Sequence, residues 1–176
     1  MLVTTLITKH EVPIPIIPNR SELDDMYREH HAMVFRTAYR VTGNSADAED
    51  VLQTVFLRMV RREDSAEGIE YPENYLRRAA VHAALDVVRA RRSGEEIDLE
   101  RLPAKGGSQP DEGDLRDFLR QALSELPARS AEIFTLRFFE GLTNPEIAKA
   151  LGISSLLVAV TLHRTRREIQ KKLRAS

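Results

Sequence analysis

Apolar residues recur at helical spacing along most of the chain. One stripe falls at positions i, i+1, i+4, i+5 and i+8, the period of a single helix face, and comprises Val51, Leu52, Val55, Phe56 and Met59. A second stripe ends before Pro127 and comprises Leu115, Phe118, Leu119, Ala122, Leu123 and Leu126. Sustained strand alternation is absent outside the first 17 residues, where prolines disfavour a central strand. The pattern therefore predicts an all-α fold.

The segment 142–173 predicts a helix-turn-helix. Thr143 and Glu146 have the spacing of a capping box, and Pro145 is tolerated in the first turn, where its missing N–H costs nothing. Gly152 supplies the left-handed conformation that ends this helix, and Ser154 can cap the next one. The apolar face of the first helix comprises Ile147, Ala148 and Leu151. Two helices joined by a glycine-containing turn match the DNA-binding motif.

Composition excludes several classes of protein. The chain of 176 residues has no cysteine, which excludes disulfides, thiolate metal sites and cysteine nucleophiles. Its five histidines are scattered without a metal-ligand spacing such as H-E-x-x-H. No glycine-rich phosphate loop or nucleophile elbow occurs. We therefore expect neither an enzyme with a small-molecule substrate nor a metal or cofactor.

Nothing in the sequence indicates a membrane protein. No apolar run approaches the roughly 18 residues that a membrane span needs. The first 20 residues lack the basic n-region and the small-residue cleavage site of a signal peptide. We therefore expect a cytoplasmic protein without membrane insertion.

Charge divides the chain into three parts. Residues 21–92 carry 11 Lys/Arg and 13 Asp/Glu, residues 93–114 carry 2 and 7, and residues 115–176 carry 11 and 6. The middle part also contains Gly, Pro and Ser, which predicts a flexible acidic linker. The basic third part has the charge that phosphate binding requires, although a solvated helix face has a similar composition. We predict an N-terminal extension (1–20) and two small helical domains (21–92 and 115–176) around this linker.

Carboxylates gather in the first turn of the helix that carries the first stripe. They favour the positive end of the helix dipole, which accounts for them without any partner. The dipole does not account for Gln53, nor for the arginines that follow. A second interpretation is that this helix docks on a helix of another protein, with polar contacts fixing the register. The docking face would comprise Asp50, Gln53, Thr54 and Leu57.

Longer strings in the chain resemble one bacterial family. Two strings in this chain resemble region 2 of the extracytoplasmic-function (ECF) sigma factors. They are D-A-E-D-V-L-Q-T-V-F-L at 47–57 and P-E-N-Y-L-R-R-A-A-V-H-A-A-L-D-V-V-R-A-R-R at 72–92. A third string resembles region 4 of the same family. It is L-P-A-R-S-A-E-I-F-T-L-R-F-F-E-G-L-T-N-P-E-I-A-K-A-L-G-I-S at 126–154. The strings and their spacing cover about 21–174. The resemblance implies a region 2 helical bundle followed by a region 4 helix-turn-helix.

The resemblance implies that the helix at 47–57 binds core RNA polymerase, on a coiled coil of its largest subunit. The implied contact residues are Asp47, Asp50, Gln53, Thr54 and Leu57.

The resemblance also implies that residues 63–92 bind the melted −10 promoter element. Binding of a single strand needs stacking surfaces and cations, and the implied residues are Tyr71, Tyr75, Arg77, Arg78, His82, Arg89, Arg91 and Arg92. Tyr75 equally suits packing in the core, in a position where the family usually has tryptophan. Two features depart from the family: His82 replaces a usual asparagine, and the loop 63–71 carries four carboxylates that would repel phosphate.

The helix from 155 to 173 is implied to enter the major groove of the −35 element. The implied residues are Ser154, Ser155, Leu156, Ala159, Val160, His163, Arg164, Arg166 and Arg167. Ala159 and Thr161 replace a lysine and an arginine that are usual in the family, which removes cations that attract phosphate and bind guanine. The apolar residues at its N-terminal end suit either thymine methyl groups or a protein surface.

The function implied by the resemblance is that of a sigma factor, with core RNA polymerase and promoter DNA as partners and an anti-sigma factor as regulator. An alternative is a sigma-like interaction protein that sequesters an anti-sigma factor or polymerase without reading promoter DNA. The altered recognition helix favours this alternative, whereas the arginines of 72–92 favour the sigma factor. A lone helix-turn-helix repressor would leave the string at 47–57 unexplained.

Overall fold

The computed structural model describes residues 20–61, 71–94 and 112–175. These residues form seven helices and no strand, which confirms the all-α prediction. The helices are α1 (Arg20–Thr42), α2 (Ser45–Val60), α3 (Pro72–Gly94), α4 (Glu112–Glu125), α5 (Ala128–Phe138), α6 (Asn144–Leu151) and α7 (Ser155–Ala175). The linker predicted at 93–114 is too long at both ends, because α3 continues to Gly94 and α4 begins at Glu112. The rest of that linker and the N-terminal extension to residue 19 lie outside the described residues.

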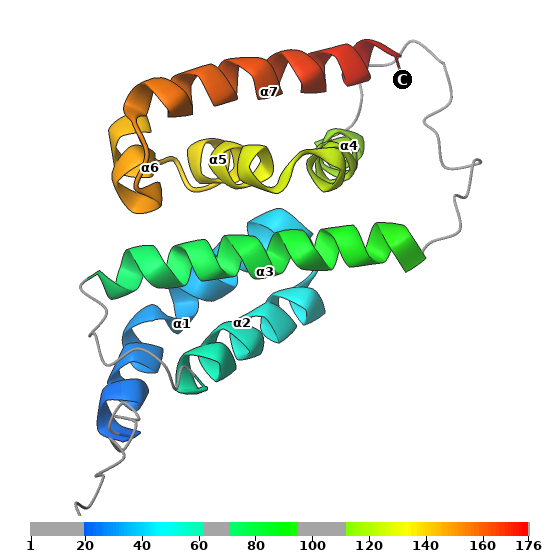
Figure 1. Cartoon of the computed structure of the whole chain (residues 1–176). Helices are drawn as coiled ribbons and strands as arrows, with labels where there is room; N and C mark the ends of the chain where they lie inside the picture. Colours follow the sequence, from blue (N-terminus) through cyan, green and yellow to red (C-terminus); the bar gives the residue numbers. More distant parts are fainter. Residues whose placement is uncertain (1–19, 62–70, 95–111, 176) are drawn as a thin grey trace, which may run out of the picture.

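Helix α3 lies between two groups of helices (Figure 1). On one side it packs against α1 and α2, and on the other it contacts α4 and α5. Helix α5 lies in turn between α3 and α7. Because α3 has neighbours on both sides, the buried apolar side chains of the two groups belong to one contiguous core.

The predicted apolar stripes face this core. In α2, Val51, Val55, Phe56 and Met59 are buried and Leu52 is half-buried. In α4 the burial increases along the helix: Leu115 is exposed, Phe118 and Leu119 are half-buried, and Ala122 and Leu123 are buried, as is Leu126 directly after the helix. Helical periodicity therefore identified the buried face of both helices.

The helix-turn-helix has the predicted local geometry. The hydroxyl of Thr143 accepts a hydrogen bond from the backbone N–H of Glu146, while the Glu146 carboxylate accepts one from the backbone N–H of Thr143, at 3.4 and 2.7 Å. Gly152 has φ 63° and ψ 38°, in the left-handed region. The hydroxyl of Ser154 accepts a hydrogen bond of 3.2 Å from the backbone N–H of Leu157. The capping box, the glycine stop and the second cap are all confirmed.

None of the helices in the described ranges is by itself long and apolar enough to cross a membrane. Helices α6 and α7 satisfy those criteria as a pair, with a bend of 110° between them.

Replacing Gly152 by alanine is expected to lower the free energy of unfolding by about 1 kcal/mol. The cost comes from forcing a side chain into the left-handed region, since a Cβ at this position would meet no heavy atom within 4 Å. Gly152→Asn is the matched control, because asparagine tolerates this conformation better. Urea unfolding of both variants checks the prediction, and an equal loss in both would contradict it.

Candidate polymerase and DNA surfaces

The solvent face of α2 carries most of the residues predicted to bind polymerase. Asp50, Gln53 and Leu57 are exposed, because they lie opposite the buried stripe of the helix, and Thr54 is half-buried beside them. Leu57 exposes 50% of its surface and Val60 exposes 39%, so apolar area is available next to the polar groups. This face can make both apolar and hydrogen-bonded contacts with a partner.

Asp47 differs from the rest of this set. Its carboxylate lies 2.7 Å from a guanidinium nitrogen of Arg91, and its side chain is only 14% exposed. The pair joins the N-terminal end of α2 to the C-terminal end of α3. One residue predicted to bind polymerase and one predicted to bind DNA therefore neutralise each other between α2 and α3.

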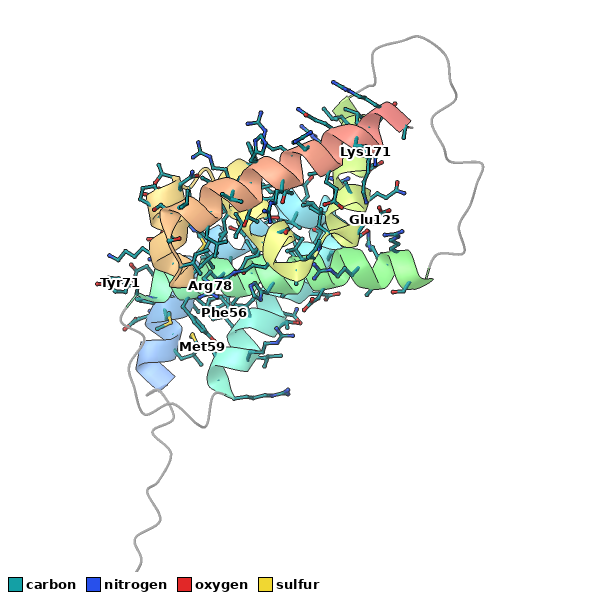
Figure 2. The ribbon with its side chains drawn as sticks, turned by 45° about the horizontal axis from the view of Figure 1, so that its top comes forward. Phe56, Met59, Tyr71, Arg78, Glu125 and Lys171 are labelled. Carbon is teal, nitrogen blue, oxygen red and sulfur yellow. The ribbon has the colours of Figure 1, made fainter. Side chains whose placement is uncertain are left out.

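Most residues predicted to bind the −10 element contact the second group of helices. Arg78 lies 3.3 Å from the Glu132 carboxylate and donates a hydrogen bond of 3.0 Å to the carbonyl of Ala150. Figure 2 shows Arg78 on the side of α3 that faces this group. On the same side, His82 Nε2 lies 2.7 Å from Glu132.

Further contacts extend this arrangement to both ends of α3. At its start, the Lys149 ammonium lies 4.8 Å from the centre of the Tyr71 ring. Toward its end, Arg92 lies 3.0 Å from the Glu125 carboxylate, which also pairs with Lys172 of α7. The second group of helices therefore contacts α3 along much of its length.

Two members of the −10 set, Arg89 and Arg91, pair away from the second group of helices. Arg89 pairs with Asp86 one turn earlier, at 3.6 Å, and Arg91 pairs with Asp47 as described. Tyr75 is half-buried and packs against the core, as the packing interpretation of this residue expected. Residues 63–70 of the predicted loop lie outside the described residues.

Glu132 is a buried carboxylate with three cationic or basic neighbours. Its side chain is 4% exposed and accepts from Arg78 and His82 on one oxygen and from Arg129, at 3.0 Å, on the other. Burial raises the pKa of Glu132, but the hydrogen bonds and charges of His82, Arg129 and Arg78 outweigh it and lower the pKa from 4.5 to about 2. Glu132 therefore stays ionised at neutral pH between α3 and α5.

Glu140 is the second buried carboxylate at this interface, with its side chain 4% exposed. Its Oε2 accepts a hydrogen bond of 2.8 Å from the Thr37 hydroxyl and lies 3.8 Å from Arg77 Nε. Its Oε1 lies 3.4 Å from Arg40, which also donates to the carbonyl of Phe139. Glu140 thus connects the turn after α5 with α1 and α3.

The residues predicted to bind the −35 element lie on the exposed side of α7 or at its start. Leu156, Val160, His163 and Arg167 recur at spacings of four, three and four, which places them on one face, and all are exposed. Leu156 exposes 73% of its surface. With Leu157, 50% exposed, and Val160, 38% exposed, it forms what we call the apolar tip of α7.

A groove of about 460 Å³ runs beside this face, between α5, α6 and α7. Its lining includes the cations Arg137, Arg166 and Arg167 together with Asn144 and His163. Arg166 also lies over the ring of Phe138, 5.8 Å from its centre. Such a cationic groove suits phosphate groups. Among the residues that the structure describes, no group of three or more carboxylates and histidines is placed to hold a metal ion.

Sequence reasoning missed the carboxylates that hold the two groups of helices together. Glu132 gave a local signal, since it stands within the apolar run Ala131–Leu136 of α5, and a charged residue on a buried face is usually paired. Glu140 and Glu125 gave no such local signal, because their partners are distant in the sequence.

Comparison with known proteins places this arrangement in a family. Residues 26–94 match Sigma-70 region 2, and residues 117–169 match Sigma-70 region 4. The RNA polymerase sigma-E factor of Streptomyces coelicolor is 30% identical over 153 residues, which cover 86% of this chain and 86% of that protein. The chain belongs to the ECF sigma factors. Sigma factors are transcription initiation factors and not enzymes.

Two further proteins resemble this ECF sigma factor. The ECF RNA polymerase sigma factor SigE of Mycolicibacterium smegmatis is 32% identical over 157 residues, which cover 85% of this chain but 61% of that protein. The solved structure of CnrH in complex with the cytosolic domain of CnrY has the same fold, with a TM-score of 0.54 and 21% identity over 90% of this chain and 92% of that one.

Acid is expected to destabilise this ECF sigma factor through Glu132. Because its pKa is lower in the folded chain than the ordinary 4.5, the stabilisation is complete above pH 4.5 and is lost as the pH falls toward 2. The shift corresponds to about 3 kcal/mol at neutral pH. Urea unfolding between pH 6 and pH 2 should show a shallower acid decline for Glu132→Gln than for the unchanged chain. Parallel declines would contradict this.

Proposed function

We propose that this chain recruits core RNA polymerase to promoters through α2 and contacts promoter DNA through α3 and α7. The observation that carries the proposal is the presence of both sigma regions, in order, on one chain. The α2 face combines a carboxylate, an amide and apolar area. Asp50 and Gln53 would fix the register on a helical partner, while Leu57 would add apolar contact.

For the −10 element, α3 supplies the cations and the ring that a single strand requires. Arg77, Arg78 and His82 lie on one side of the helix, and Tyr71 at its start supplies a stacking surface. In this proposal the strand runs along α3, with its phosphates on the guanidinium groups and one base against Tyr71.

For the −35 element, α7 would contact bases at its start and phosphates further along the helix. The apolar tip would meet base edges, where the thymine methyl group is the apolar feature of the major groove. Arg164, Arg167 and Lys171 lie further along the exposed side of the helix and would contact phosphates. We therefore expect a −35 element with thymines opposite the tip rather than one selected through guanine.

Regulation by an anti-sigma factor and a cytoplasmic place of action are part of this proposal. An anti-sigma factor that covered the exposed face of α2 would exclude polymerase by direct competition. Core polymerase and the chromosome are then the targets, and neither requires the chain to leave the cytoplasm.

Run-off transcription tests the proposal. The chain is mixed with core polymerase and a template that carries the upstream region of its own gene, and a discrete transcript that requires the chain is the expected result. A second candidate function, a sigma-like protein that sequesters an anti-sigma factor or polymerase, is favoured by the apolar tip of α7. Absence of a transcript on genomic templates, together with tight binding to an anti-sigma domain, would support the second candidate.

A further inference from the structure

The groove between α5, α6 and α7, which we call the cationic groove, holds arginines that no carboxylate neutralises. Every arginine of α3 pairs with a carboxylate. By contrast, no carboxylate in the described parts of the chain pairs with Arg137, Arg166 or Arg167, which line the groove. None of the lining residues is acidic. Like charges around one hollow repel one another, so an anion that entered the groove would be attracted by all three.

Arg137 is fixed in position on the α5 side of the cationic groove. It is half-buried, and one of its guanidinium nitrogens donates a hydrogen bond of 2.8 Å to the carbonyl of Leu142. A guanidinium carries five N–H donors, so others remain for a ligand. An arginine that is held before binding loses little side-chain freedom when the ligand arrives. Arg137 therefore has the features of a preformed anion site.

An aromatic ring stands next to these cations. Phe138 exposes 48% of its surface and lines the groove. Its ring packs on that of the buried Phe134, with 4.5 Å between the ring centres, and the Arg166 guanidinium lies 5.8 Å from the centre of the Phe138 ring. A planar base can stack on such a ring or on a guanidinium. The groove thus combines cations with a stacking surface.

This combination suits a free nucleotide better than a duplex. The bases of duplex DNA are stacked on one another, so its backbone would bring phosphates to the groove but no free ring to Phe138. A nucleotide carries both. Asn144 and Gln170 add amide groups to the lining, and such amides hydrogen-bond to the edge of adenine. The volume of about 460 Å³ lies within the range of small-molecule sites, about 300 to 1,000 Å³.

We propose that the cationic groove binds a nucleoside triphosphate, with its phosphates on the three arginines and its base against Phe138. The groove shares four residues with the set predicted for the −35 element, namely Ala159, His163, Arg166 and Arg167. A bound nucleotide would therefore exclude duplex DNA from this side of α7. That consequence rests on the proposed function, whereas the nucleotide site itself does not.

Isothermal titration calorimetry of the full chain with ATP tests the site. The groove variant, Arg166→Gln with Arg167→Gln, is compared with Arg164→Gln with Lys171→Gln, which removes the same charge from exposed positions of α7 outside the groove lining. We expect ATP to bind the unchanged chain and this control alike, and the groove variant to bind about tenfold more weakly or worse. Absence of ATP binding to the unchanged chain at millimolar concentration, or equal weakening in both variants, would overturn the inference.

Phe138→Leu tests the ring separately from the cations. Leucine keeps apolar contact with Phe134 but offers no ring for a base. We expect about tenfold weaker binding of ATP and unchanged binding of inorganic tripolyphosphate, which has no ring. Circular dichroism checks that the variant is helical. In the unchanged chain, tripolyphosphate that bound as tightly as ATP would reveal a general anion site and overturn the assignment to nucleotides.

The consequence for DNA is measured in a separate experiment. Fluorescence anisotropy of a labelled promoter duplex, without polymerase and at constant ionic strength, should show that ATP displaces DNA from the unchanged chain. DNA that stays bound at saturating ATP would overturn the exclusion. Absence of run-off transcription, with ATP still bound in calorimetry, would overturn the proposed function alone. Normal transcription without ATP binding in calorimetry would overturn the nucleotide site alone.

Discussion

Asp50→Arg is expected to abolish co-purification of the chain with core RNA polymerase. Asp50 is exposed on α2, next to Gln53 and Leu57 and opposite the buried stripe. In the proposed contact with polymerase, reversing the charge of Asp50 would place two cations against each other where water is excluded. Breaking a charge pair of this kind costs about 2–5 kcal/mol, and reversal adds repulsion. We therefore expect an affinity loss of more than about 100-fold.

Glu49→Arg is the matched control for this variant. Glu49 is the preceding residue, is also exposed, and undergoes the same change of charge. A helix turns about 100° per residue, so Glu49 lies beside the proposed docking face rather than at its centre. Pull-down with core polymerase at increasing salt should separate the two variants. Equal retention of Asp50→Arg and the unchanged chain would exclude this face as the polymerase site.

Restoring two cations to α7 is expected to strengthen DNA binding. Ala159 and Thr161 stand at the two positions where the resemblance described above implies a lysine and an arginine, and Ala159 is exposed near the start of the helix. Each new phosphate contact steepens the dependence of log K on log salt by about 0.9. Ala159→Lys with Thr161→Arg should therefore raise affinity for duplex DNA about ten- to a hundredfold near 0.1 M salt.

Cations added at the far end of α7 provide the control. Leu173→Lys with Ala175→Arg adds the same charge to exposed positions outside the groove lining, about 20 Å along the helix from Ala159 and Thr161. Anisotropy titrations on a promoter duplex at several salt concentrations should give a steeper slope for the first variant. Equal slopes and affinities for the two variants would show that the start of α7 does not approach the phosphates.

Local chemistry made much of this fold predictable. Thr143, Gly152 and Ser154 act on backbone groups within four residues of themselves, so their sequence spacing determines their geometry. The buried stripe of α2 follows equally from helical periodicity. The strings at 47–57 and 126–154 then identified the family, which no single helix could have done.

The interface between the two regions was not predictable in this way. Arg78 and Glu132 are 54 positions apart, and Thr37 and Glu140 are 103 apart. Neither pair has a periodicity or spacing that marks it, because many exposed arginines and glutamates could pair equally well. The polymerase set was affected similarly, since Asp47 has a partner on another helix that local reasoning could not identify.

The apolar tip of α7 has a thermal consequence. Contacts between leucine or valine side chains and thymine methyl groups remove apolar surface from water, so they carry a negative change in heat capacity and strengthen on warming from low temperature. Phosphate contacts by the arginines respond to salt instead. Temperature would then adjust how well this sigma factor distinguishes promoters, while ionic strength would adjust how tightly it holds any of them.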